Sequence, residues 1–176
     1  MTGIRHEHPF PTLKKLDVNG AKDLVLQAQS SERQRKNFNF HPELDDPIQR
    51  LANAFEPGTY VPPHRHIDPD RWEMFLLIEG RAAILVFDDE GKVTDRAELG
   101  RDNDSQCSVA EIPPGAWHSV VALTAGTVLF EVKAGPYARL TDKGFASWAP
   151  RENETQAARS ITKWMEQAQV GDLFVM

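Results

Sequence analysis

The 176-residue sequence has a single cysteine, no long apolar run and no surplus of basic residues. Cys107 alone cannot form an intramolecular disulfide, and no apolar stretch near the N-terminus resembles a secretion signal, so we expect a cytoplasmic protein. The longest apolar runs, 74–78 and 82–87, are far shorter than the roughly 20 residues that span a bilayer, which argues against a membrane protein. The net charge of −6 argues against nucleic acid as a partner. We expect a small-molecule ligand as the partner.

Short segments rich in β-branched and aromatic residues dominate the middle of the chain, and turn residues separate them. We expect strands at 48–56, 71–78, 82–87, 92–99, 109–112, 118–123 and 128–133. No helical pattern interrupts these segments. The pattern therefore predicts a mainly β protein, built as an antiparallel sandwich or barrel.

Helical patterns flank the predicted strands on both sides. The first is expected over about 20–36, with Asn19 as N-cap, and the second over 155–169. Three segments follow from these patterns: an N-terminal arm and helix over 1–47, a barrel over 48–135, and a C-terminal tail and helix packed on the barrel over 136–176.

The residue types that carry chemistry lie in two places, Gly58–Gly80 and Pro113–His118. A strand has a side-chain period of two, so His64 and His66 should share one face while Arg65 points to the other. Three imidazoles and a carboxylate on neighbouring strands would surround a divalent transition metal and leave coordination positions open. Iron, manganese, nickel, cobalt, copper and zinc all accept such nitrogen and oxygen ligands. The predicted ligands are His64, His66, Glu73 and His118.

This spacing resembles the two motifs of the cupin superfamily. The first, G(X)5HXH(X)3–4E(X)6G, is matched by Gly58, His64, His66, Glu73 and Gly80, and the second, G(X)5PXG(X)2H(X)3N, by Pro113, Gly115 and His118. The chain departs from the motifs because six residues separate His66 from Glu73, and because Cys107 and Ala122 replace a glycine and an asparagine. Asp70, at the usual distance from His66, is the alternative carboxylate, and a site of three histidines alone is a further alternative.

More narrowly, the chain is similar to the WbuC family of cupin-fold metalloproteins. The similarity covers most of the chain, including NFNFHPELDDPIQRLANAFEPGTYVPPHRH, WEMFLLIEGRAAILVFDDEG, VAEIPPGAWHSVVAL and FASWAP. It implies a cupin-like antiparallel β-barrel (a double-stranded β-helix, or jelly roll) with an N-terminal helix and a C-terminal helix, and one divalent transition metal. Family members occur in polysaccharide or O-antigen gene clusters, which implies a sugar as ligand. Cupin-like barrels often pair through strands, which implies a homodimer.

The resemblance leaves several functions open. Metal-dependent isomerisation or epimerisation of a sugar or sugar nucleotide is the first, and an iron-dependent dioxygenase is the second. A non-catalytic metal- or sugar-binding module is the third. No catalytic residue can be assigned, since a proton-transfer group beside the metal would have to be His41 or a metal-bound hydroxide.

Three residues outside the metal motif could contact a ligand. Asn39, His41 and Arg50 are candidate substrate-binding residues, and Arg50 would suit an anionic group. Turn contacts by Asn39 and His41, and an outward salt bridge by Arg50, are the structural alternatives. His6 and His8 form a second His-X-His pair, which we interpret as part of a solvated arm because no strand pattern flanks it.

Overall fold

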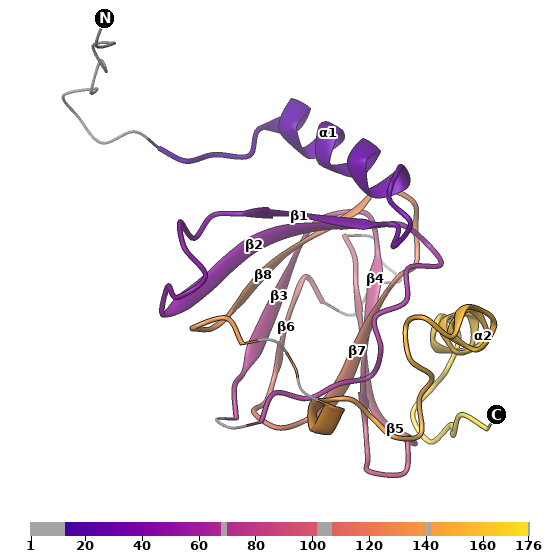
Figure 1. Cartoon of the computed structure of the whole chain (residues 1–176). Coiled ribbons are helices and arrows are strands. Elements are labelled where there is room, and N and C mark those ends of the chain that lie inside the picture. Colours follow the sequence, from indigo (N-terminus) through magenta and orange to yellow (C-terminus); the bar gives the residue numbers. More distant parts are fainter. Residues whose placement is uncertain (1–12, 68–69, 102–106, 139, 141, 176) are drawn as a thin grey trace, which may run out of the picture.

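The computed structural model describes residues 13–67, 70–101, 107–138, 140 and 142–175 (Figure 1). Within these residues, none of the helices has the length and apolar character needed to span a lipid bilayer. The elements are α1 (Val18–Gln29), β1 (Arg35–Asn39), β2 (Ile48–Phe55), β3 (Glu73–Glu79), β4 (Ala82–Phe87), β5 (Val93–Leu99), β6 (Val109–Ile112), β7 (Trp117–Ala122), β8 (Thr127–Ala134), the 3-10 turn Asp142–Gly144 and α2 (Thr155–Met165).

The strands form two antiparallel sheets. One has five strands in the order β1-β2-β8-β3-β6, and the other has three in the order β5-β4-β7. Each is a separate hydrogen-bonded ladder, so the predicted barrel is open and resembles a sandwich. The prediction of a mainly β architecture with a helix at each end is confirmed.

Three apolar clusters arrange the molecule in layers, with α1 above one sheet and α2 beside the other (Figure 1). Between the sheets, Phe75 and Leu77 of β3 pack with Ile84 of β4. The outer side of the three-stranded sheet packs against α2, and the outer side of the five-stranded sheet packs against α1. Successive residues of β4 point alternately into the core between the sheets and toward α2, as expected for a strand buried on both faces.

The N-terminal helix ends earlier than its pattern predicts. It begins after Asp17, whose carboxylate accepts a hydrogen bond from the backbone N–H of Gly20, and it ends at Gln29. The hydroxyl groups of Ser30 and Ser31 bond to carbonyls of the last turn, a local contact that competes with helix continuation. Arg35 and Lys36, predicted as the end of this helix, instead begin β1, which pairs with β2 and extends the sheet.

The C-terminal helix is fixed to the barrel by a buried arginine. Its predicted start at Thr155 is correct, but it ends at Met165 rather than Gln169. The guanidinium of Arg96, on β5, donates to the carbonyl oxygens of Met165 (2.9 Å), Glu166 (3.1 Å) and Ala168 (3.0 Å). A cation at this position also suits the negative end of the helix dipole. Arg96 therefore joins β5 to α2.

The inward-facing rows of the sheets determine where polar residues gather. On β3 the row is Glu73, Phe75 and Leu77, and the last two residues lie in the core between the sheets. On β7 it is His118, Val120 and Ala122, again with the last two in that core. The first member of each row is polar and buried. A polar cluster therefore lies at the end of the apolar core.

Candidate metal site

Four predicted ligands converge at this end of the core. His64, His66, Glu73 and His118 each offer one ligand atom, and these atoms lie within 4.8 Å of one another. Nε2 of His66 is 2.8 Å from Oε1 of Glu73, and Nε2 of His118 is 3.2 Å from Oε2 of the same carboxylate. Three imidazole nitrogens and a carboxylate are a donor set that could hold a divalent transition metal. Among the described residues, these four form the one cluster of histidine and acidic side chains that could hold a metal ion.

The segment that carries His64 and His66 is extended but is not a regular strand. His64 forms isolated bridges to His118 and to Phe145, with backbone N–O distances to His118 of 2.9 and 2.8 Å. The expected alternation holds, because the guanidinium of Arg65 points away and stacks over the ring of Trp117 at 4.2 Å. Backbone pairing thus fixes His64 beside β7, and the alternation places His66 on the same face.

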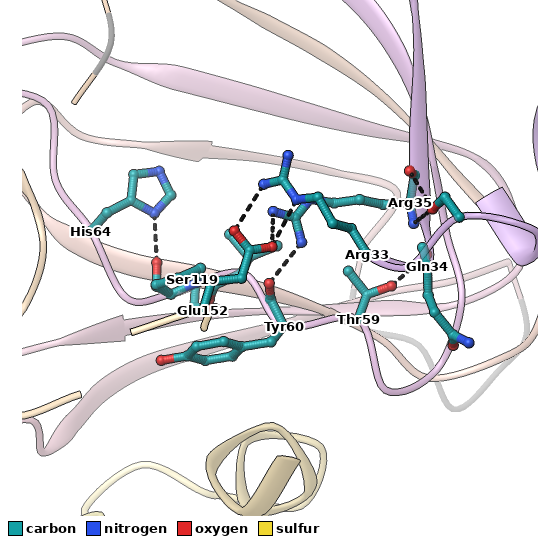
Figure 2. A network of polar contacts seen from close by, with 11 residues as sticks. Arg33, Gln34, Arg35, Thr59, Tyr60, His64, Ser119 and Glu152 are labelled. Atoms are coloured by element: carbon teal, nitrogen blue, oxygen red, sulfur yellow. Dashed lines mark hydrogen bonds and ion pairs between the residues drawn. The ribbon is translucent and has the colours of Figure 1, made fainter. Parts of the chain in front are cut away.

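Two of the imidazoles are held in one orientation and one tautomer. Nδ1 of His64 is 2.9 Å from the carbonyl oxygen of Pro62, a contact drawn in Figure 2. Nδ1 of His118 is likewise 2.9 Å from the carbonyl oxygen of Ala116. A carbonyl accepts only from a protonated nitrogen, so Nε2 of each ring is left with its lone pair facing the cluster. Ligating histidines in metalloproteins use this same outer contact.

Burial and neighbouring charges keep these groups in the protonation states that bind a metal. Burial lowers the pKa of His64 well below its usual range, and His118 and His66 lower it further. His64 is therefore neutral at pH 7. Burial alone would raise the pKa of Glu73, but the Lys133 ammonium and the adjacent imidazoles of His118 and His66 lower it well below its usual range. The carboxylate is thus ionised and ready to act as a ligand.

Lys133 belongs to the site although the sequence pattern did not single it out. It stands opposite Glu73 in the β3–β8 register, so both side chains point inward. Its ammonium lies 3.1 Å from Oε1 of Glu73 and 2.5 Å from Oε1 of Glu131. Although burial lowers the pKa of Lys133, these two carboxylates raise it above its usual range, so the ammonium is charged. Glu131 in turn accepts a hydrogen bond from Asn53 on β2.

A cavity of about 670 Å³ opens in front of the cluster. His64 and His66 lie on its wall together with Gln49 of β2 and Lys133 of β8. The segment after β8 also contributes to the lining, through Tyr137, Ala138, Leu140, Phe145 and Glu152. A small molecule in this cavity would therefore lie next to two of the proposed ligands.

The alternative carboxylate lies apart from the cluster. Asp70 is exposed, and its side chain lies over Gly115, where an added Cβ would be 3.3 Å from Oδ2. The enlarged loop before β3 thus directs Asp70 away, and Glu73 occupies the position beside the three imidazoles.

The other candidate residues make local contacts and are absent from the described lining of the cavity. The ring of His41 is buried and accepts a hydrogen bond from the backbone N–H of Arg50. The guanidinium of Arg50 pairs with Asp46 at 2.8 Å, because register places Gln49 rather than Arg50 on the inward face. Asn39 accepts from Asn37 on β1, three strands from β3. His6 and His8 lie outside the described residues.

The two carboxylates can be distinguished by neutral substitutions. Glu73→Gln should weaken metal binding by at least about tenfold, since even outer contacts of a metal site have effects of that size. Asp70→Asn should leave the affinity close to that of the wild type, because its side chain lies outside the cluster. Competition with a chromophoric chelator measures both. The reverse order of effects would move the ligand into the loop before β3.

The sequence matches a family model described as a domain of unknown function (DUF6016) over residues 16–99, slightly less than half of the chain. None of the curated proteins matches it.

Several solved structures are similar in outline, with sequence identities below 20%. KdgF from Halomonas sp. has 16% identity and a TM-score of 0.44, with 59% of this chain and 82% of that one covered. A cupin superfamily protein from Desulfitobacterium hafniense DCB-2 has 15% identity, a TM-score of 0.45 and coverage of 63% and 86%. A conserved protein of unknown function from Streptococcus pyogenes has 14% identity, a TM-score of 0.48 and coverage of 78% and 100%.

Proposed function

We propose that this protein binds one divalent transition metal through His64, His66, Glu73 and His118 and uses it to act on a small molecule in the adjacent cavity. The convergence of the four donor atoms within 4.8 Å carries the proposal. It is supported by the Nδ1 contacts, which direct Nε2 of His64 and His118 into the cluster. A bound divalent ion would supply Lewis-acid polarisation of a carbonyl or hydroxy oxygen.

Residues of the chain would hold the ion, orient its ligands and position the small molecule. The three imidazoles and Glu73 would hold the ion, and the carbonyls of Pro62 and Ala116 would fix two of the rings. Lys133 would balance the charge of Glu73 and Glu131. The cavity wall would orient the ligand beside His64 and His66.

The resemblance to the WbuC family extends this proposal to a sugar or sugar nucleotide of surface polysaccharide biosynthesis, with isomerisation or epimerisation as the reaction. An iron-dependent dioxygenase is the oxidative form of the same proposal. The homodimer and the cytoplasmic location stay predictions from the sequence.

An open coordination position separates an active metal from one that only stabilises the barrel. Four protein donors leave about two positions of an octahedral ion for water. We therefore expect the Mn²⁺-loaded protein to increase the relaxation rate of bulk water protons several-fold over Zn²⁺-loaded protein of equal concentration. Proton relaxation measured against Mn²⁺ occupancy tests this.

Stoichiometric Mn²⁺ without enhanced relaxation would contradict the proposal. It would mean that protein ligands close the coordination sphere, as in a non-catalytic module with a structural ion.

A further inference from the structure

The cavity beside the metal cluster has an unequal distribution of charge. Its lining includes three cationic side chains, Arg33, Arg71 and Lys133, and we call these the cationic wall. Among the described residues of the same lining, Glu152 is the acidic one. The cationic wall comes from three distant parts of the chain, so folding brings these charges together around one space.

Two members of the cationic wall are already neutralised by the protein. Arg33 binds Glu152 through two hydrogen bonds of 2.8 and 3.1 Å, and Arg35 joins the same carboxylate at 2.8 Å, as Figure 2 shows. Lys133 contacts the carboxylates of Glu73 and Glu131. These pairs account for the charge of the two side chains without a ligand.

Arg71 is different. Within the described residues it forms no ion pair, and its guanidinium donates to the backbone carbonyl of Pro136. This contact holds the side chain against the segment after β8, on the cavity wall that also contains His64 and His66. A partly buried guanidinium with free N–H groups and no carboxylate partner binds a planar or tetrahedral oxyanion well.

We propose that the ligand of this cavity carries an anionic group, a carboxylate or a phosphate, which Arg71 binds directly. The inference rests on the proposed function, because the same ligand would present its uncharged oxygens to the ion at His64 and His66. Arg71 is then a specificity-determining residue for acidic or phosphorylated small molecules.

Binding of three probes that differ in one group tests this inference. D-glucuronate carries a carboxylate, D-glucose 6-phosphate a phosphate and D-glucose neither, and each is titrated calorimetrically into metal-loaded and metal-free protein. We expect at least one anionic probe to bind about tenfold or more tightly than glucose. Arg71→Gln should remove about that factor, the size of a hydrogen bond to a charged group.

Arg50→Gln is the matched control. It removes another partly exposed arginine, which pairs with Asp46 and lies outside the described cavity lining, so the preference for the anion should persist. Equal binding of all three probes, absence of binding by both anions, or equal loss in the two variants would each overturn the inference.

Metal content of every sample, measured by elemental analysis, keeps this inference distinct from the proposed function. A protein that prefers the anion through Arg71 but holds no metal would refute the metal site and support the anion site. A protein that holds metal but does not prefer the anion would do the opposite. The better of the two anionic probes identifies the carboxylate or the phosphate as the group bound.

Discussion

His118→Ala should retain less than about a tenth of the metal bound by the wild type, because the change removes one of four donors and leaves Glu73 without one of its two imidazole partners. His118 is 3% exposed and begins the inward row of β7, so water cannot readily replace its ring as a well-placed ligand. Elemental analysis after incubation with iron, manganese, nickel, cobalt, copper and zinc ions, followed by gel filtration, measures the loss. Circular dichroism checks that the variant is folded.

The control for this experiment is the double variant His6→Ala/His8→Ala. It removes the other His-X-His pair of the chain, which the sequence assigns to the N-terminal arm. Its metal content should equal that of the wild type. Equal losses in the two variants would refute the assignment of the site, and a wild type that binds none of the six ions would refute the metal proposal itself.

Arg96→Ala should produce a large loss of stability at a position away from the metal cluster. The change leaves three carbonyl oxygens at the end of α2 and the carboxylate of Glu98 without their buried partner. Each buried acceptor left unpaired costs about 1–3 kcal/mol, so we expect a decrease of about 3 kcal/mol or more in the free energy of unfolding. For a chain of this length, that decrease lowers the melting temperature by roughly 6–12 °C.

Two further variants show whether the loss comes from these hydrogen bonds. Arg96→Lys keeps the charge but not the planar fork, and should give an intermediate melting temperature. Arg159→Ala removes an exposed arginine from α2 itself and should change stability by no more than about 0.5 kcal/mol. Thermal denaturation followed by fluorescence measures the melting temperatures of all three, and urea denaturation measures their free energies of unfolding. A melting temperature of Arg96→Ala equal to that of Arg159→Ala would show that the buried contacts add nothing.

The convergence of His64, His66, Glu73 and His118 is predictable from the sequence because these residues belong to short local motifs. His64 and His66 are two residues apart, and Pro113–His118 form a turn that leads directly into β7. Spacing along the chain is then enough to indicate which side chains share a face. The strands between 48 and 134 were predictable for the same reason, since alternation and turn residues are local signals.

Residues that depend on strand register could not be predicted in this way. Lys133 faces Glu73 only because β8 pairs with β3, and Gln49 reaches the cavity only because β2 pairs with β8 in one register. A shift by one residue would have placed Arg50 inside, as the sequence interpretation allowed. β1 was missed because its five residues are mostly polar, so their pairing with β2 leaves no apolar alternation to detect.

The cavity is lined partly by residues of the sheets and partly by the irregular segment after β8. This difference affects which of its residues can change during evolution. The proposed metal ligands lie on or beside strands whose inward rows also form the core, so their substitution would disturb packing as well as chemistry. Tyr137, Ala138 and Leu140 instead line the cavity from a segment outside the sheets. Such a segment tolerates change more easily. Relatives can therefore keep the same cluster of imidazoles and carboxylate while acquiring new ligands through substitutions confined to a few residues after β8.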